Sequence, residues 1–162
     1  MATKLTKKQA AQLLSAYENE QTAAANASVA AYNKAVDADT EKTEAEIAAQ
    51  QKDAQKTADT AYDRAALDAL IERRRIAETL SNLGLSDSGV AKSAAESINR
   101  KQAVAVRTAT AAKRKVLSEL SQKLITAREQ AAAKKAKNAA SVNKTLKGKI
   151  AEKKLTLNKS AV

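Results

Sequence analysis

The stretch Asn82-Leu83-Gly84-Leu85-Ser86-Asp87-Ser88-Gly89 decides the fold, because it lies near the middle of the 162-residue chain and holds two of its three glycines. The sequence on either side of it is rich in alanine and charged residues and contains no proline, a composition typical of long helices. A short glycine-containing break between two such regions indicates a turn. We therefore expect the chain to run out, turn at residues 83–88 and come back.

Gly84 suits the C′ position that follows a helix, where the backbone adopts a left-handed conformation that costs glycine little. With Gly84 at C′, Leu85 would make the hydrophobic contact of a Schellman ending with Leu80. Ser86 or Ser88 can then accept hydrogen bonds from free backbone N–H groups and begin a second helix. The turn residues are therefore interpreted as caps.

The region before the turn has a helical pattern with an eleven-residue repeat, from about residue 28 to residue 83. Such a period favours a straight or slightly right-handed arrangement over a leucine zipper. Leu67, Leu70 and Ile71 widen the apolar stripe before the turn. The first row of the repeat consists of Val36, Ile47, Ala58, Ala69 and Leu80, and the second row of Tyr32, Thr43, Ala54, Ala65 and Ile76.

The second helix is expected to run from about Asp87 into the 130s, with apolar residues at helical spacing. Val104, Val106, Leu117 and Ile125 flank that stripe and make the apolar surface broader than one partner helix needs. Contact with another subunit or another protein is the natural interpretation. The stripe consists of Ala94, Ile98, Ala105, Ala109, Ala112, Val116, Leu120, Leu124, Ala127 and Ala131.

The sequence thus predicts an all-α, coiled-coil-like antiparallel helical hairpin in three segments. Residues 1–24 form either a short separate helix or the beginning of the first long one, with Thr6 as the candidate N-cap. Residues 25–131 form the hairpin. Residues 132–162 are expected to be a basic, partly irregular arm, flexible alone and ordered on a partner. Gly148 interrupts its helical pattern and Leu155-Thr156-Leu157 alternates like a short strand.

Charge is divided unevenly along the chain. Residues 1–83 carry 11 basic and 13 acidic side chains, whereas residues 84–162 carry 18 and 5. This asymmetry indicates a basic arm that meets an anionic partner, although a solvated face that balances the acidic half would look the same. The lysines expected to make the anionic contact are Lys134, Lys135, Lys137, Lys144, Lys147, Lys149, Lys153 and Lys154.

The chain lacks side chains that catalysis commonly uses. Histidine and cysteine are both absent, which removes the commonest general base, the commonest metal ligand and any thiolate zinc site. Ser86 and Ser88 resemble nucleophiles only superficially, since capping explains them. Carboxylate pairs such as Asp37/Glu41 and Asp59/Asp63 share a helix face, which a solvated surface explains better than a metal site. We expect no catalytic residue, metal, cofactor or small-molecule substrate.

Nucleic-acid contact fits the basic half better than membrane contact does. Lysines on an alanine-rich helix give salt-dependent phosphate contacts without sequence preference. The three tyrosines lie in the less basic half, so base stacking is not expected. The basic segments lack the large aromatic anchors of interfacial helices, and neither a signal peptide nor a membrane span is evident.

The stretch from Ile76 to Gly89, followed by a long Ala/Arg/Gln helix, resembles helical virion proteins of tailed bacteriophages. In that group a long helix ends in a Gly-Leu/Val-Ser-x-Ser-Gly turn and a second helix returns. The likeness covers roughly residues 65–130. It implies an internal protein ejected with the genome or a component of the portal and neck region, and it brings no catalytic residue. The lysine-rich end departs from many ejected proteins, which argues against pore formation.

The expected function is therefore that of a non-enzymatic structural protein of a tailed-phage virion, present in the host cytoplasm during assembly. Its partners would be further copies of itself, portal or tail proteins, and DNA or an acidic protein at the basic arm. The alternatives are a histone-like, sequence-independent DNA-compacting protein and a coiled-coil scaffold or adaptor. The residues expected to carry assembly are Leu80, Leu83, Leu85, Ile98, Val116, Leu120 and Leu124.

Overall fold

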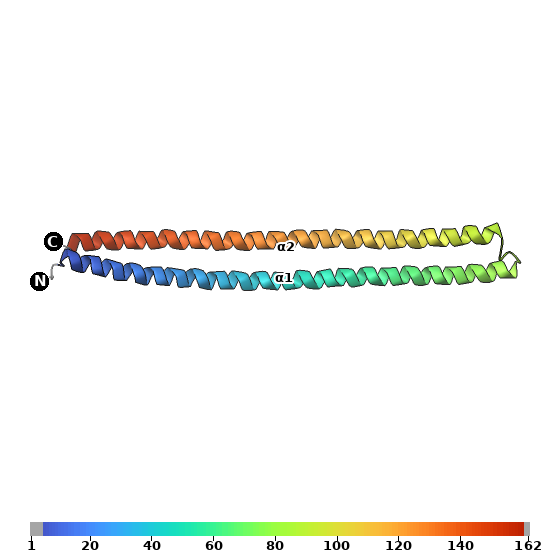
Figure 1. Cartoon of the computed structure of the whole chain (residues 1–162), viewed down its shortest axis with the longest axis horizontal. Helices are drawn as coiled ribbons and strands as arrows, with labels where there is room; N and C mark the ends of the chain where they lie inside the picture. The colour runs from blue at the N-terminus through green and yellow to red at the C-terminus, as the bar shows by residue number, and fades with distance from the viewer. Residues whose placement is uncertain (1–4, 161–162) are drawn as a thin grey trace. The chain divides into compact units, whose positions relative to one another are not determined.

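The computed structural model describes residues 5–160 and contains two helices, α1 (Lys7–Asn82) and α2 (Gly89–Ser160). They comprise 76 and 72 residues and pack against each other as an all-α helical hairpin (Figure 1). This confirms the predicted fold class. The loop between them is the glycine-containing stretch from which the hairpin was predicted.

The contacts between the helices divide the chain into two units. The turn unit is Glu44–Leu124 and contains the end of α1, the loop and the beginning of α2. The open unit comprises the described residues of the remainder, 5–43 and 125–160. Each unit therefore contains one stretch of each helix.

Helix α1 ends in a Schellman motif. Gly84 has a φ of 68°, the left-handed conformation in which glycine is favoured. The N–H of Leu85 donates to the carbonyl of Leu80 at 2.8 Å, and the N–H of Gly84 donates to the carbonyl of Ser81 at 3.1 Å. These two bonds satisfy carbonyls that the end of a helix leaves without partners.

Helix α2 begins at Gly89, two residues after the predicted start at Asp87. The reason is the cap: Oγ of Ser88 accepts from the N–H of Ala91 at 3.4 Å and itself donates to the carbonyl of Leu85 at 2.6 Å. Ser88 therefore links the loop residue Leu85 to the first turn of α2.

The turn unit contains most of the fully buried side chains. Its buried α1 positions lie on the two rows of the eleven-residue repeat, and they are three successive alanines between Ile47 and Leu80. Ile98 is the most deeply buried large side chain, with 2% of its surface exposed. The buried apolar residues of this unit are Ile47, Ala58, Ala65, Ala69, Leu80, Ile98 and Leu120.

The open unit has a thinner core, in which only Ala10 and Leu157 are fully buried among the residues described. Its α1 begins in a reciprocal cap: the N–H of Gln9 donates to Oγ1 of Thr6 at 3.3 Å, and the N–H of Thr6 donates to Oε1 of Gln9 at 3.0 Å. From Lys7 onward the helix continues without a break, so the described part of segment 1–24 is the beginning of the first long helix.

The prediction of a partly irregular arm at residues 132–162 is wrong for the part that the structure describes, because 132–160 are helical. A glycine in a helix interior costs only about 1 kcal/mol relative to alanine, too little for Gly148 to end a helix whose lysines and alanines favour it. The strand-like alternation has a helical explanation. Leu157 is 7% exposed and Leu155 is 62% exposed, since residues two apart lie on nearly opposite faces of a helix. Residues 161–162 lie outside the described part.

Candidate functional site

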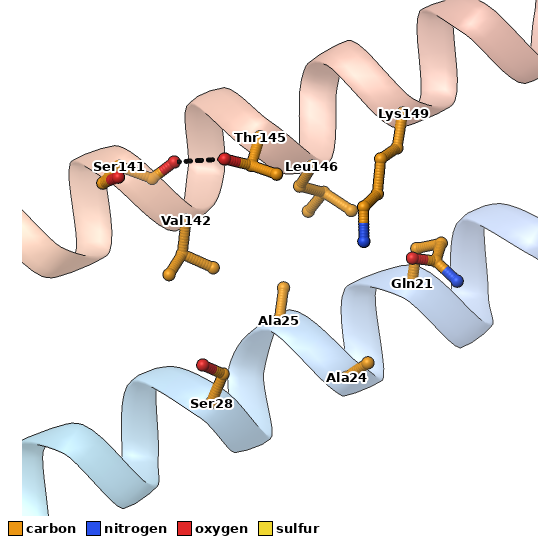
Figure 2. A pocket seen from close by; sticks show the side chains of 9 residues that line it. All are labelled: Gln21, Ala24, Ala25, Ser28, Ser141, Val142, Thr145, Leu146 and Lys149. Carbon is orange, nitrogen blue, oxygen red and sulfur yellow. Dashed lines mark hydrogen bonds between the residues drawn. The ribbon is translucent and has the colours of Figure 1, made fainter.

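The open unit carries a groove of about 260 Å³ where small side chains meet between α1 and α2 (Figure 2). Among the residues that line it, Lys149 alone is ionisable. Oγ1 of Thr145 donates to the backbone carbonyl of Ser141 at 3.1 Å, so this hydroxyl is already engaged within its own helix. The remaining lining residues are Gln21, Ala24, Ala25, Ser28, Val142 and Leu146. No acid and base face each other in this groove, which favours an incomplete helix contact over a catalytic site.

The turn unit has a larger groove of about 480 Å³, in which alanine is the commonest lining residue. Asp53 and Lys113 are its two charged lining residues, and Val116 and Leu120 are its largest apolar ones. Alanine leaves such grooves because its side chain is too short to fill the space between two helices. The groove therefore follows from the small residues Ala54 and Ala58 in the middle of the two rows of the eleven-residue repeat.

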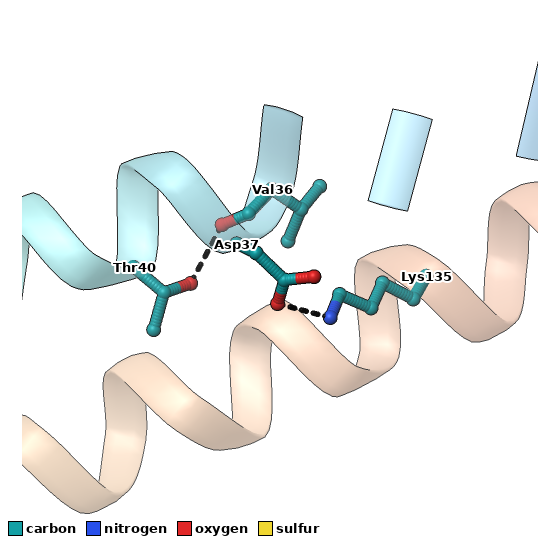
Figure 3. A network of polar contacts seen from close by, with 4 residues as sticks. All are labelled: Val36, Asp37, Thr40 and Lys135. Carbon is teal, nitrogen blue, oxygen red and sulfur yellow. Dashed lines mark hydrogen bonds and ion pairs between the residues drawn. The ribbon is translucent and has the colours of Figure 1, made fainter. Parts of the chain in front are cut away.

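The carboxylate pairs do not form a metal centre in the described part of the chain. Residues 5–160 contain no group of three or more acidic side chains arranged to hold a metal ion. Asp59 accepts both hydrogen bonds of the Gln55 amide, at 2.8 and 3.0 Å. Asp37 instead forms an ion pair with Lys135 of α2 (Figure 3). The neighbouring residue Val36 accepts a hydrogen bond at its backbone carbonyl from the hydroxyl of Thr40.

The two serines of the turn have different positions. Ser88 caps α2, and its hydroxyl hydrogen is given to a backbone carbonyl. Ser86 lines a groove of about 220 Å³ beside Leu80 and Ile98, in which Arg73 is the one charged residue. Ser88 therefore acts as a helix cap, and Ser86 lies beside packed apolar side chains. The residues that line the groove at Ser86 include no general base.

The predicted assembly residues separate into an inner and an outer set. Leu80, Ile98 and Leu120 are buried between α1 and α2, and Leu124 is half-buried, so these side chains stabilise the hairpin itself. The three that remain exposed are Leu83, Leu85 and Val116. Of the predicted assembly residues, these three offer the most surface to another molecule without opening the hairpin.

The predicted lysines also separate into two groups. Lys135 and Lys153 are half-buried: the first is paired with Asp37, and Nζ of the second lies 5.3 Å from the ring centre of Tyr17. Lys134 and Lys149 are exposed at the edges of grooves in the open unit. The other four exposed lysines have no hydrogen bond or ion pair within the described chain, and they are Lys137, Lys144, Lys147 and Lys154.

Polar contacts across the turn unit were not anticipated. Nζ of Lys101 donates to Glu72 at 2.7 Å, and Arg73 donates to the side chain of Asn99 at 2.6 Å and to that of Gln102 at 3.3 Å. Each pair lies roughly equally far before and after the turn. Counting outward from the turn would therefore have found them.

No helix of the described residues is long and apolar enough to cross a membrane. Comparison with models of known families, with curated proteins and with solved structures finds no match for the chain.

Proposed function

We propose that this chain is a non-enzymatic structural component of a tailed-phage virion, which assembles in multiple copies through exposed apolar helix surfaces. Its basic C-terminal stretch contacts packaged DNA or an acidic neighbouring protein. The observation that carries the proposal is the imbalance between large apolar residues that are buried and those that are exposed. Five are buried among residues 5–160, whereas twelve are exposed.

This imbalance matters energetically. Burying a leucine, isoleucine or valine side chain contributes about 1.5–3 kcal/mol, and the hairpin obtains that contribution from few of its large residues. The open unit is the extreme case, with one buried alanine and one buried leucine. Further burial on a second molecule would add stability that the isolated chain lacks.

The basic contact is supported by four exposed lysines in the basic stretch of α2 that form no hydrogen bond or ion pair within the described residues, Lys137, Lys144, Lys147 and Lys154. Lys137 and Lys144 are seven residues apart, as are Lys147 and Lys154, so each pair spans two helical turns or about 10 Å along the axis. Flexible lysines on one helix can bind phosphates as point charges without reading bases.

The virion setting rests on the resemblance of the Ile76–Gly89 stretch to the turn of helical phage virion proteins. Its test is mass spectrometry of particles purified from the phage or prophage that encodes the chain, with DNA-filled and empty particles compared. We expect the protein in mature, DNA-filled particles. Its presence only in empty precursors would indicate a scaffold instead, and its absence from both would reject the virion proposal.

The phosphate contact has a separate test. Purified protein is mixed with DNA duplexes of unrelated sequence over a series of salt concentrations. We expect equal affinities for all sequences and a steep loss of affinity as salt rises. An affinity that does not change with salt concentration, or an absence of binding at low salt, would contradict the phosphate contact and favour an acidic protein as the partner.

The same lysines favour one second candidate, a histone-like protein that compacts DNA outside particles. Such a protein would condense long DNA when no other virion component is present. Light scattering of long DNA at increasing protein concentration distinguishes the two. A histone-like protein would condense the DNA, whereas a virion component that only contacts phosphates would bind the DNA without condensing it.

A further inference from the structure

We propose that the outward face of α1 around Leu67 and Leu70 binds the same face of a second copy, in an antiparallel contact with two-fold symmetry. This contact deepens the proposed multi-copy assembly and rests on it. It lies within the turn unit and on a single helix.

Helix α1 has two apolar faces at this level. Ala65 and Ala69 are 8% and 5% exposed and pack inside the hairpin. Leu67, Leu70 and Ile71 are 55%, 58% and 57% exposed, although the sequence suggested that they widen the inner stripe. At about 100° per residue, Leu67 lies almost opposite the buried alanines. The largest side chains of this segment therefore remain outside the hairpin.

Charges on either side of these residues identify a second copy as the occupant. Asp63 lies one turn before Leu67, and Arg74 lies one turn after Leu70. Asp63 and Arg74 are eleven residues apart, about three turns, so both occupy the outward face with the leucines. Between residues 63 and 74 the face thus has an acidic end, an apolar middle and a basic end.

An antiparallel copy of this face is complementary to it. When Leu67 is opposite Leu70 of a second copy, Asp63 is opposite Arg74 of that copy, and the symmetry repeats both contacts at the other end. Neither Asp63 nor Arg74 forms an ion pair within residues 5–160. DNA is a poorer occupant, because Asp63 and the three large apolar side chains offer nothing to a phosphate backbone.

The contact is small, and three large apolar residues per copy fall below the burial of a stable interface. We therefore expect a reversible dimer that forms at high protein concentration or as one contact within a larger assembly. Sedimentation velocity of the full-length chain, from low micromolar to near-millimolar concentration, measures its dissociation constant.

The decisive variants reverse the charges. Asp63→Arg or Arg74→Asp alone places like charges opposite each other twice per dimer, and each should weaken association by about tenfold. The double variant Asp63→Arg/Arg74→Asp restores opposite charges and should restore association. Within one chain these residues are about 16 Å apart along the helix axis, so rescue requires a second copy.

A second pair of variants tests the apolar middle. Leu67→Glu/Leu70→Glu should abolish the dimer, whereas Val104→Glu, which changes an equally exposed apolar residue of α2, should leave it intact. Circular dichroism verifies that each variant keeps its helices. The charge variants still decide the matter if the leucine variant loses helix, because both charged residues are exposed.

Two results would overturn the inference in different ways. If the chain associates but neither single reversal weakens association, or the double variant stays as weak as the singles, another face carries assembly and the multi-copy proposal survives. If the wild-type chain is monomeric at every concentration, both this contact and self-assembly by the chain alone are rejected.

Discussion

Tyr62 donates its hydroxyl hydrogen to Oγ1 of Thr110 across the turn unit, at 3.0 Å. The direction follows from Thr110, whose single hydroxyl hydrogen is already donated to the carbonyl of Val106 at 2.8 Å. This part-buried bond joins α1 to α2 in a stretch where the packed side chains are mostly alanine. It therefore contributes to the register of the two helices where apolar contact specifies it weakly.

Tyr62→Phe should lower the free energy of unfolding by about 0.5–1.5 kcal/mol, because it removes one hydrogen bond and leaves Thr110 a free acceptor site. Urea unfolding followed by circular dichroism measures the change. Adding Thr110→Val to Tyr62→Phe should lower the free energy of unfolding only a little further, because the hydrogen bond between these two side chains is already lost. A Tyr62→Phe variant as stable as the wild type would mean that water replaces the bond fully.

Gly84→Ala should destabilise the hairpin by about 1–2 kcal/mol, the cost of holding a residue with a Cβ in the left-handed region. The cost is one of backbone conformation alone, because a Cβ at Gly84 would meet no atom within 4 Å. Gly148→Ala is the matched control: it also has open space, but its backbone is helical, so it should stabilise by about 0.5–1 kcal/mol. Thermal unfolding of the two variants should shift in opposite directions.

Ser88→Ala should cost about 1 kcal/mol, because the first turn of α2 loses its side-chain acceptor. Ser86→Ala provides the comparison, since Ser86 caps neither helix and should change stability by less than half as much. Chemical denaturation of both variants tests this difference. Equal effects would show that the cap depends on the backbone alone.

Replacing Lys137, Lys144, Lys147 and Lys154 together by glutamine should flatten the salt dependence of DNA binding. The slope of log affinity against log salt falls by about 0.9 for each phosphate that is no longer neutralised, or at most about 3.6 for four. The control removes the same total charge from exposed lysines of the turn unit, Lys52, Lys56, Lys92 and Lys115. A slope that falls equally in both variants would indicate attraction to net charge, with no localised contact.

The sequence was most informative where one residue type has one physical role. Gly84 could be placed at the end of α1 because glycine alone adopts that backbone without strain. The eleven-residue repeat identified the packed face of α1, and Ile47, Ala58, Ala69 and Leu80 are buried as that repeat requires. These features depend on local geometry and periodicity, which a single sequence records.

The sequence was less informative where two apolar residues compete for one position. Val116 and Leu117 are adjacent and about 100° apart on α2, and the structure leaves Val116 exposed and Leu117 half-buried. The exposure of Leu67 was equally hard to predict, because alanines occupy the buried positions of α1 that larger residues normally fill. Binding to a partner molecule leaves no periodic signal of its own, so the candidate surfaces required the fold.

The N–H of Leu5 donates to the carbonyl of Ser160 at 3.3 Å, so the first and last described residues are immediate neighbours in the open unit. A few added residues would join them, and the polypeptide could then be opened at the exposed loop beside Leu85. Such a circular permutant would connect the same two helices at their other ends. Its folding would reveal whether the hairpin needs its glycine loop, or whether side-chain pairing along the helices suffices.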